Sequence, residues 1–370
     1  MNPRAPHSEF ADRFDRVRAA MDERDIDCLL VAPSTDMVYL IDFPVRQSER
    51  MTILVLPRDG EPRLVMPGFE LDRIASVPPL FQPAPWEDGD DPAPLLASLL
   101  PNEGDGVTVA IGGQMFTHFF LRIRDAAPNA RFVSGDAVLE PTRMRKSPYE
   151  VAALQAASEA ADAVFEELLA LPLTGMSERD LLAEIHRLLL EKGHDTIGGG
   201  IVGAGPNGAA PHHHVSDRPI ERGDAVVVDF GGVRANYRSD ITRTFHVGEP
   251  NGDFRSVYDL VNEANEAGFE AVKPGVTAAE IDARTRRHIA DAGYGPSFLH
   301  RTGHGIGLDG HEAPYLVRGD DTVLEEDMTF SIEPGIYLEG RFGVRIEDIV
   351  VVTATGAERL NRSTHALQVV

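Results

Sequence analysis

A weak internal repeat in the second half of the chain constrains the fold more than any other feature of the sequence. Residues 175–177, Gly-Met-Ser, open a capped helix that should end at Gly193, and residues 275–277, Gly-Val-Thr, open another that should end at Gly293. The number of residues from the opening glycine to the closing glycine is the same in both segments. Such a duplication predicts two similar halves that face each other across a pseudo-two-fold axis.

Each predicted helix is followed by a glycine-rich segment with histidines and then by an apolar strand that ends in an acid. Three valines precede Asp229 in the first half, and Phe-Ser-Ile precedes Glu333 in the second. A second acid follows in each half, Asp240 in the first and Glu347 in the second. If the two halves face each other, these four carboxylates should converge on the centre of the domain.

The cost of burying a carboxylate makes this centre a candidate metal site. Asp229 must be neutralised by a cation, by protonation or by a metal, and the same holds for Glu333. A structural ion pair is the competing interpretation for either acid alone. Because a strand repeats its face every second residue, Asp240 should begin a polar inner face, whereas Asp348, which follows Glu347, should face away.

A histidine between glycines, His304, is the candidate nitrogen ligand, since Gly303 and Gly305 let the backbone approach the centre closely. Taken alone it could equally be a turn residue. Four carboxylates with one imidazole suit Mn²⁺ or another hard to intermediate divalent ion. The single cysteine, Cys28, begins an apolar run and should be a buried small hydrophobe, so cysteine-based zinc sites are excluded.

The chain has 370 residues, which on a prior of roughly 100 to 200 residues per domain predicts two domains. Residues 1–140 alternate helix-like and strand-like segments and should form an α/β domain. Its predicted helix lies at 8–24, and its predicted strands lie at 29–32, 52–56, 63–66 and 107–111. An N-cap, a first-turn proline and a capping-box glutamate at residues 147–150 open a long helix, so the second domain should span residues 147–370.

Charge and hydropathy exclude several classes of partner. The formal charge of -24 without a visible basic stripe argues against nucleic acid. No apolar run approaches the ~20 residues that span a bilayer, so no membrane is expected. The start of the chain lacks the apolar core and cleavage site of a secretion signal, which predicts a cytoplasmic location.

The order Asp229, Asp240, His304, Glu333, Glu347, with Glu-Pro-Gly-Ile-Tyr at 333–337 and Arg-Ile-Glu-Asp at 345–348, resembles the pita-bread metallopeptidases. The resemblance covers nearly the whole chain and is strongest from about residue 147. It implies an α+β fold in which an N-terminal α/β creatinase-like domain precedes a C-terminal pita-bread domain with internal pseudo-two-fold symmetry.

By this resemblance two divalent ions occupy the site, Mn²⁺ first, with Co²⁺ and Zn²⁺ as alternatives. Asp229 would chelate one ion and His304 the other together with Glu333, while Asp240 and Glu347 would bridge both. A hydroxide shared by the ions would be the nucleophile, and Glu333 would shuttle the proton.

The resemblance assigns further catalytic roles to side chains that hold the carboxylates or face the substrate: Arg345, Tyr337, His212, His300 and His311. Arg345 and Tyr337 would keep the acids in place, and two of the three histidines would face the substrate. Spacing to Asp229 selects His212 within the triple histidine, with His213 as the rival. For each of the three, a surface histidine in a loop is the alternative interpretation.

Within this family, prolidases and aminopeptidases P both cut the bond before proline. A dipeptidase must bind a free carboxylate, for which arginine is the expected partner. Some prolidases carry that arginine directly after His-Glu-x-Pro, whereas here Tyr315 follows residues 311–314 and Arg318 comes later. The short chain and compact first domain are similar to the prolidase group. We therefore predict an Xaa-Pro dipeptidase acting on short proline-containing peptides, with aminopeptidase P acting on longer peptides second.

Two rival functions lie outside peptide cleavage. One is a non-peptidase hydrolase or lyase of the same fold with an ectoine-type or sulfonium substrate, since fold alone does not determine substrate. The other is a non-catalytic binding module, against which the complete set of five ligands argues. The resemblance also implies a homodimer.

Overall fold

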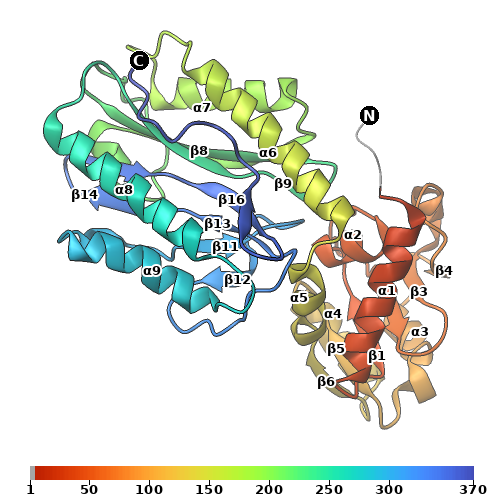
Figure 1. The fold of residues 1–370 in the computed structure, drawn as a ribbon. Coiled ribbons are helices and arrows are strands. Elements are labelled where there is room, and N and C mark those ends of the chain that lie inside the picture. The colour runs from red at the N-terminus through yellow and green to blue at the C-terminus, as the bar shows by residue number, and fades with distance from the viewer. Residues whose placement is uncertain (1–4) are drawn as a thin grey trace. The chain divides into compact units, whose positions relative to one another are not determined.

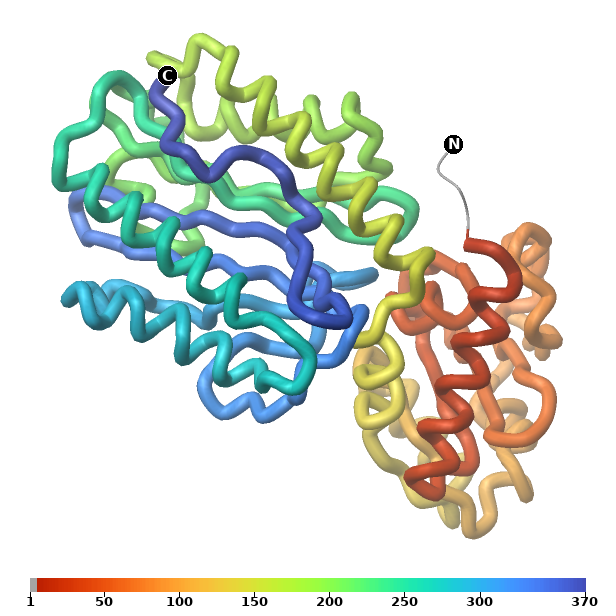
Figure 2. The backbone as a smooth tube through the Cα atoms, viewed as in Figure 1, coloured from red at the N-terminus to blue at the C-terminus, as the bar shows by residue number. Residues whose placement is uncertain are grey.

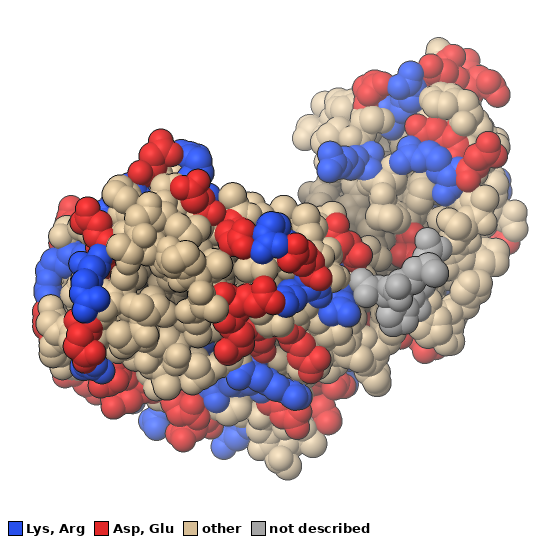
Figure 3. All heavy atoms as spheres, turned by 90° about the horizontal axis from the view of Figure 1, so that it is seen from above, with Lys and Arg blue, Asp and Glu red and all other residues tan. Residues whose placement is uncertain are grey.

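A computed structural model describes residues 5–370 and divides them into two compact units, residues 5–143 and residues 144–370. Both units combine helices with β-sheet, in agreement with the predicted α+β class (Figure 1). No helix in the described part of the chain is long and apolar enough to cross a membrane. On the face of the molecule drawn in Figure 3, lysines and arginines lie interspersed among acidic side chains.

The first unit is built on a six-stranded sheet with the order β4-β3-β2-β1-β5-β6. Its strands are β1 Cys28–Val31, β2 Ile53–Pro57, β3 Arg63–Pro67, β4 Gln82–Trp86, β5 Thr108–Ile111 and β6 Arg131–Ser134. Its helices are α1 His7–Asp22, α2 Thr35–Ile41, α3 Pro92–Ser98, α4 Thr117–Ala126 and α5 Asp136–Met144. The amphipathic helix and the four strands predicted for this region are confirmed, and Cys28 is fully buried in the core as expected.

Two strands of this sheet, β4 and β6, were not predicted. β4 lies inside a proline-rich tract and contains Pro83 and Pro85, which lack the N–H that a sheet ladder needs. The strand is tolerated because it lies at the edge of the sheet, where it pairs only with β3, in parallel.

The second unit begins with the long helix α6, Pro148–Leu168. The hydroxyl of Ser147 accepts a hydrogen bond from the backbone N–H of Glu150 at 3.3 Å, and the Glu150 carboxylate accepts one from the N–H of Ser147 at 2.9 Å. The predicted capping box is therefore present.

The predicted duplication of helices is confirmed. α7, Glu178–Glu191, starts after the N-cap Ser177, and α9, Ala278–Asp291, starts after the N-cap Thr277, each with a complete capping box. A glycine with positive φ follows both helices, at 99° and 88° respectively, at Gly193 and Gly293. This left-handed conformation costs glycine little and ends each helix where the repeat predicts.

Two sheets lie in this unit, together with a hairpin (Figure 2). The first has the order β10-β8-β7, with β9 paired to β8, and its strands are β7 Thr196–Ala204, β8 Ala225–Arg234, β9 Tyr237–Arg238 and β10 Ile241–His246. The second has the order β12-β11-β13-β16-β17, and its strands are β11 Gly303–Gly305, β12 Glu312–Leu316, β13 Thr329–Ile332, β16 Asp348–Val352 and β17 Ala357–Arg359. The hairpin pairs β14 Gly335–Leu338 with β15 Phe342–Arg345.

Helices cover both sheets. α6 and α7 pack their apolar side chains on the first sheet, whose core includes Phe165 and Val228. α8, Gly252–Ala271, and α9 pack on the second sheet and on the hairpin, against residues such as Phe330 and Val344. An antiparallel bridge between Thr242 and Glu347 joins the two halves at the centre.

The predicted end of the strand at Asp229 is wrong. β8 continues to Arg234, so Asp229 lies in the middle of a strand. The glycines that follow it, Gly231 and Gly232, are not turn residues but sites of close packing, since a Cβ on Gly231 would lie 1.9 Å from the carbonyl oxygen of Ser239. In the second half, β13 does stop directly before Glu333.

Candidate metal centre

One cavity of the second unit, with a volume of about 530 Å³, gathers residues from both halves of the repeat. Beside residues of the glycine-rich strand β7, its lining includes these side chains singled out from the sequence: Asp229, Asp240, His304, Glu333, Glu347, Arg345, His212 and His300. His311 lines the same cavity. Asp229 lies on β8, Asp240 directly before β10, and His304 on β11.

Within this cavity, ligand atoms of Asp240, His304 and Glu347 all lie within 4.8 Å of one another. Nε2 of His304 is 4.0 Å from Oδ2 of Asp240 and 3.4 Å from Oε1 of Glu333. Glu347 is buried, whereas Asp240 and Glu333 keep part of their surface open to the cavity. Such a spacing of oxygen and nitrogen atoms is compatible with ions between them.

The imidazole of His304 is held in the form that binds metals. Nδ1 lies 3.1 Å from the carbonyl oxygen of Gly305, so the N–H on Nδ1 donates to the backbone and the lone pair of Nε2 faces the acids. Burial first, and then the neighbouring His311, lower the pKa of His304 to about 3. The ring is therefore neutral at ordinary pH.

Burial and mutual repulsion act strongly on the acids. Burial raises the pKa of Asp240 and of Glu347 well above the usual carboxyl range, and the neighbouring carboxylates add to that rise. Burial also raises the pKa of Glu333 to about 7, against the opposing charge of Arg345. A cluster of acids that resists ionisation without a positive charge fits divalent cations, and its oxygen-rich donor set fits hard to intermediate ions.

Arg345 supports the acids of the cavity through hydrogen bonds. The side chain is 3% exposed and donates hydrogen bonds to Oδ2 of Asp229 at 2.6 Å, to the hydroxyl of Tyr337 at 2.7 Å and to the hydroxyl of Thr242 at 3.1 Å. Thr242 in turn donates to Oε2 of Glu347 at 2.6 Å. One guanidinium thus orients acids of both halves, as expected for a residue that supports metal ligands.

His300 is linked to this support. Its Nε2 lies 2.8 Å from the hydroxyl of Tyr337 and its Nδ1 lies 2.8 Å from the carbonyl oxygen of Arg301. Burial lowers the pKa of His300 to about 4 and raises the pKa of Tyr337 to about 12. Both groups are therefore neutral and serve as fixed hydrogen-bonding partners beside Glu333, 3.9 Å from the imidazole.

Two of the three consecutive histidines at residues 212–214 have different surroundings. His212 lines the cavity, whereas Nε2 of His213 lies 2.8 Å from Oε2 of Glu178. The spacing argument thus selected the histidine that reaches the cavity. The ring of His311 lies with its centroid 3.8 Å from that of His304.

Glu178 was not found from the sequence. Its carboxylate, 0% exposed, accepts hydrogen bonds from the backbone N–H of Ala204 at 2.9 Å, from the side chain of Asn207 at 2.9 Å, and from Ser216 through its N–H at 2.9 Å and its hydroxyl at 2.7 Å. Although burial opposes ionisation, these bonds together with the one from His213 lower its pKa. From the sequence it was only an acid in the first turn of a helix.

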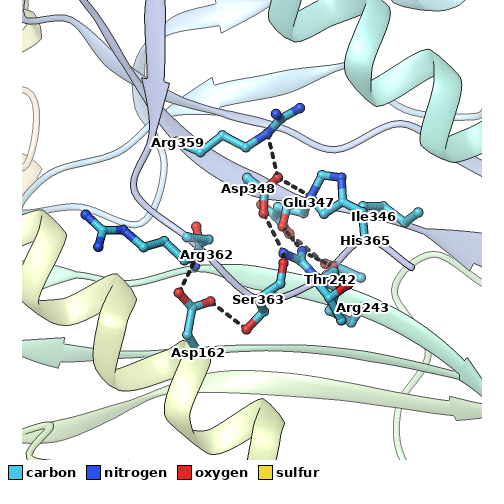
Figure 4. A network of polar contacts seen from close by, with 12 residues as sticks. Asp162, Thr242, Arg243, Ile346, Glu347, Asp348, Arg359, Arg362, Ser363 and His365 are labelled. Carbon is cyan, nitrogen blue, oxygen red and sulfur yellow. Dashed lines mark hydrogen bonds and ion pairs between the residues drawn. The ribbon is translucent and has the colours of Figure 1, made fainter. Parts of the chain in front are cut away.

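A second buried network lies behind Glu347 (Figure 4). Oδ1 of Asp348 lies 2.7 Å from Nη2 of Arg243, and its Oδ2 lies 2.5 Å from Nε2 of His365 and 3.1 Å from Nε of Arg359. These partners lower the pKa of Asp348 in spite of its burial. The prediction that Asp348 faces away from the acids of the cavity is confirmed, and its side chain points into a buried polar network.

Comparison with known proteins adds independent findings. The model of metallopeptidase family M24 matches residues 152–354, and the creatinase/prolidase N-terminal domain matches residues 13–145. A probable dipeptidase PepE of Mycobacterium tuberculosis is 42% identical over 365 residues, covering 98% of this chain and 96% of the relative. An Xaa-Pro dipeptidase of Lactobacillus helveticus is 33% identical over 363 residues, covering 96% and 98%. The crystal structure of dipeptidase PepE from Mycobacterium ulcerans superposes with a TM-score of 0.94 at 41% identity, covering 100% of both chains.

Proposed function

The chain belongs to metallopeptidase family M24, and we propose that it is an Xaa-Pro dipeptidase, which hydrolyses short proline-containing peptides with two divalent metal ions. The observation that carries the proposal is the convergence of four carboxylates and one neutral imidazole in a single cavity. Full-length likeness to dipeptidases supports the substrate class.

In this proposal Asp229 would hold one ion, His304 and Glu333 the other, and Asp240 and Glu347 both. Two bound divalent ions would lower the pKa of a shared water molecule and stabilise negative charge on the peptide oxygen. The oxygen-rich donor set favours Mn²⁺, with Co²⁺ and Zn²⁺ as alternatives.

The protein side chains would supply orientation and proton transfer. Glu333, which accepts a hydrogen bond from the hydroxyl of Ser331 at 3.2 Å, would take the proton of the attacking water and pass it to the leaving nitrogen. His212 and His311, which both line the cavity, would donate hydrogen bonds to the substrate. Arg345 would keep the acids in position. The hydroxyl of Tyr337 forms hydrogen bonds with both Arg345 and His300.

A second candidate is an aminopeptidase P that acts on longer peptides, because Tyr315 occupies the place where some prolidases carry a carboxylate-binding arginine. A non-peptidase hydrolase or lyase and a non-catalytic module have no such support, since the relatives named above are described as dipeptidases. A homodimer and a cytoplasmic location stay predictions from the sequence.

Metal removal tests the proposal. Protein stripped with a chelator should lose Xaa-Pro cleavage and regain it, by about 100-fold or more, when Mn²⁺ or Co²⁺ is added, because the ions supply both the nucleophile and charge stabilisation. The assay would compare an Xaa-Pro dipeptide, an Xaa-Pro tripeptide and ectoine. Cleavage of the tripeptide alone would establish the aminopeptidase instead, and inactivity on both peptides with every metal would refute a peptidase.

Glu178 offers a test of how the cavity is positioned. In Glu178→Gln one acceptor oxygen becomes an NH₂ group that faces N–H and O–H donors, which should loosen the loop of residues 204–216 and displace His212. We expect kcat/KM to fall roughly 10- to 100-fold, as displacements of about 1 Å do. Metal content, measured by elemental analysis, should stay unchanged because Glu178 contacts no ligand.

The matched control is Asp180→Asn, which removes the capping-box acid of the same helix without touching that loop. Its activity should be that of the wild type. Because the pKa of Glu178 is lowered by folding, its stabilisation is fully present above pH 4.5, the ordinary value, and is lost as the pH falls through the folded value. A stability difference between wild type and Glu178→Gln that grew on acidification below pH 4.5 would contradict this assignment.

A further inference from the structure

Three arginines line the cavity, Arg238, Arg301 and Arg345, and they differ in whether they form an ion pair with a carboxylate. Arg345 forms an ion pair with Asp229, but within residues 5–370 no carboxylate pairs with Arg238 or Arg301. Both of these side chains are half-buried. A guanidinium that lines a cavity and forms no ion pair with a carboxylate of the described residues can bind an anion that arrives from solution.

The surroundings of Arg301 leave its hydrogen-bonding edge free. Its guanidinium carbon lies 4.5 Å from the ring centroid of Tyr315, and Nη2 lies 3.3 Å from Nδ1 of His311. The aromatic ring supports the flat face of the guanidinium, and among residues 5–370 only its Nη2 forms a hydrogen bond to a side chain. His311 in turn stacks near His304, so Arg301 is separated from the candidate metal centre by a single side chain.

The other cavity arginine is held differently. Nε of Arg238 lies 3.4 Å from the carbonyl oxygen of Leu308, and its backbone N–H donates to the carbonyl oxygen of Gly307. Arg238 has no aromatic support and no contact with His311 among the described residues. It therefore serves as a matched comparison for Arg301.

The chemistry of a dipeptide places its carboxylate close to the reacting bond. Two bonds, of about 1.46 Å and 1.52 Å, join the scissile nitrogen to the carboxylate carbon, so the carboxylate oxygens lie within roughly 4 Å of that nitrogen. The group that binds them must stand at the rim of the metal centre, which is the position of Arg301. A longer peptide has a neutral amide at this place and forms no charge-assisted pair.

We propose that Arg301, supported by Tyr315, binds the free carboxylate of the substrate and makes the site selective for dipeptides. The inference rests on the proposed Xaa-Pro cleavage. It explains how the chain can do without arginine at position 315, because the tyrosine there supports an arginine that comes from the segment before His304. Arg318, the candidate nearest in sequence, is exposed and lies outside the cavity lining.

The first test compares Ala-Pro with Ala-Pro-amide, which differ only in the charge of the terminal group. Wild-type enzyme should favour the acid by about 10- to 100-fold in kcat/KM, as expected for a charge-assisted pair. Arg301→Gln should lose this preference mainly through a higher KM for the acid, so that the acid and the amide are cleaved with similar kcat/KM. Arg238→Gln should keep the preference. Retention of the preference in Arg301→Gln, or its loss in Arg238→Gln, would overturn the assignment.

The second test does not depend on turnover. Calorimetry should detect binding of L-proline but not of L-prolinamide to the wild type, and binding of proline should weaken at least about 10-fold in Arg301→Gln. If neither peptide is cleaved, the proposed function fails, yet proline binding that requires Arg301 still supports its role as the carboxylate receptor. Equal proline affinity in both proteins would refute that role whatever the activity.

Discussion

Replacement of Glu333 by alanine should abolish peptide hydrolysis, with kcat reduced by at least about 10³-fold. The side chain follows β13 directly, and its Oε1 lies 3.4 Å from Nε2 of His304. In the proposed mechanism it is both a metal ligand and the carrier of the proton, so its loss removes two contributions at once. The measurement is the turnover of an Xaa-Pro dipeptide at saturating Mn²⁺, with the metal content of the variant determined in parallel.

Two further variants make this result interpretable. Glu339→Ala removes an exposed acid shortly after the hairpin strand β14 and should leave activity unchanged. Glu333→Gln keeps the size of the side chain and one oxygen for the metal, so a loss of turnover with metal retained would assign the defect to proton transfer. Activity of Glu333→Ala above about one tenth of the wild-type value would contradict the proposed centre.

Replacement of Arg243 by methionine should lower the free energy of unfolding by about 3 to 5 kcal/mol. Arg243 is 1% exposed and donates to Oδ1 of Asp348 at 2.7 Å, to the carbonyl oxygen of Glu347 at 2.6 Å and to that of Ser363 at 2.8 Å (Figure 4). Methionine fills much of the volume but leaves a buried carboxylate with one partner fewer. It also removes the donor from the carbonyl oxygens of Glu347 and Ser363 and from that of Thr364, which Nε of Arg243 contacts at 3.2 Å. The contact with Glu347 also predicts weaker metal binding.

The measurement is urea unfolding of metal-free protein, because bound metal would add its own stabilisation. Arg255→Met is the control, since Arg255 pairs with Glu249 on the surface and such pairs contribute about 0 to 1 kcal/mol. Equal stability of Arg243→Met and wild type would show that this network does not hold the core together.

Sequence reasoning worked best where the physical cause is local. The capping residues Ser147, Ser177 and Thr277 satisfy backbone N–H groups within three residues, so each helix start could be located without knowledge of the fold. It failed where contacts with residues distant in the sequence determine whether a strand forms and where it ends. Prolines concealed the edge strand β4, and the strand predicted to end at the acid Asp229 continues to Arg234.

In the candidate metal centre, too, the sequence indicated which acids need a positive partner, but not which residues provide it. An acid behind buried apolar residues is costly wherever the strand lies, and this alone marked Asp229 and Glu333 as residues that need a positive partner. Their actual partners come from distant parts of the chain, because Arg345 reaches Asp229 across the two halves of the repeat. No spacing rule predicts such a pair.

The sequence by itself thus determined the duplication, the acids and the imidazole, since period, capping and burial cost are properties of short segments. Only the tertiary structure decided that His213 contacts Glu178, that Glu178 accepts hydrogen bonds from Ser216 in the following loop, and that Arg301 lies over the ring of Tyr315. The physical reason is that a side chain's orientation and hydrogen-bonding partners depend on contacts between segments that the chain brings together only on folding.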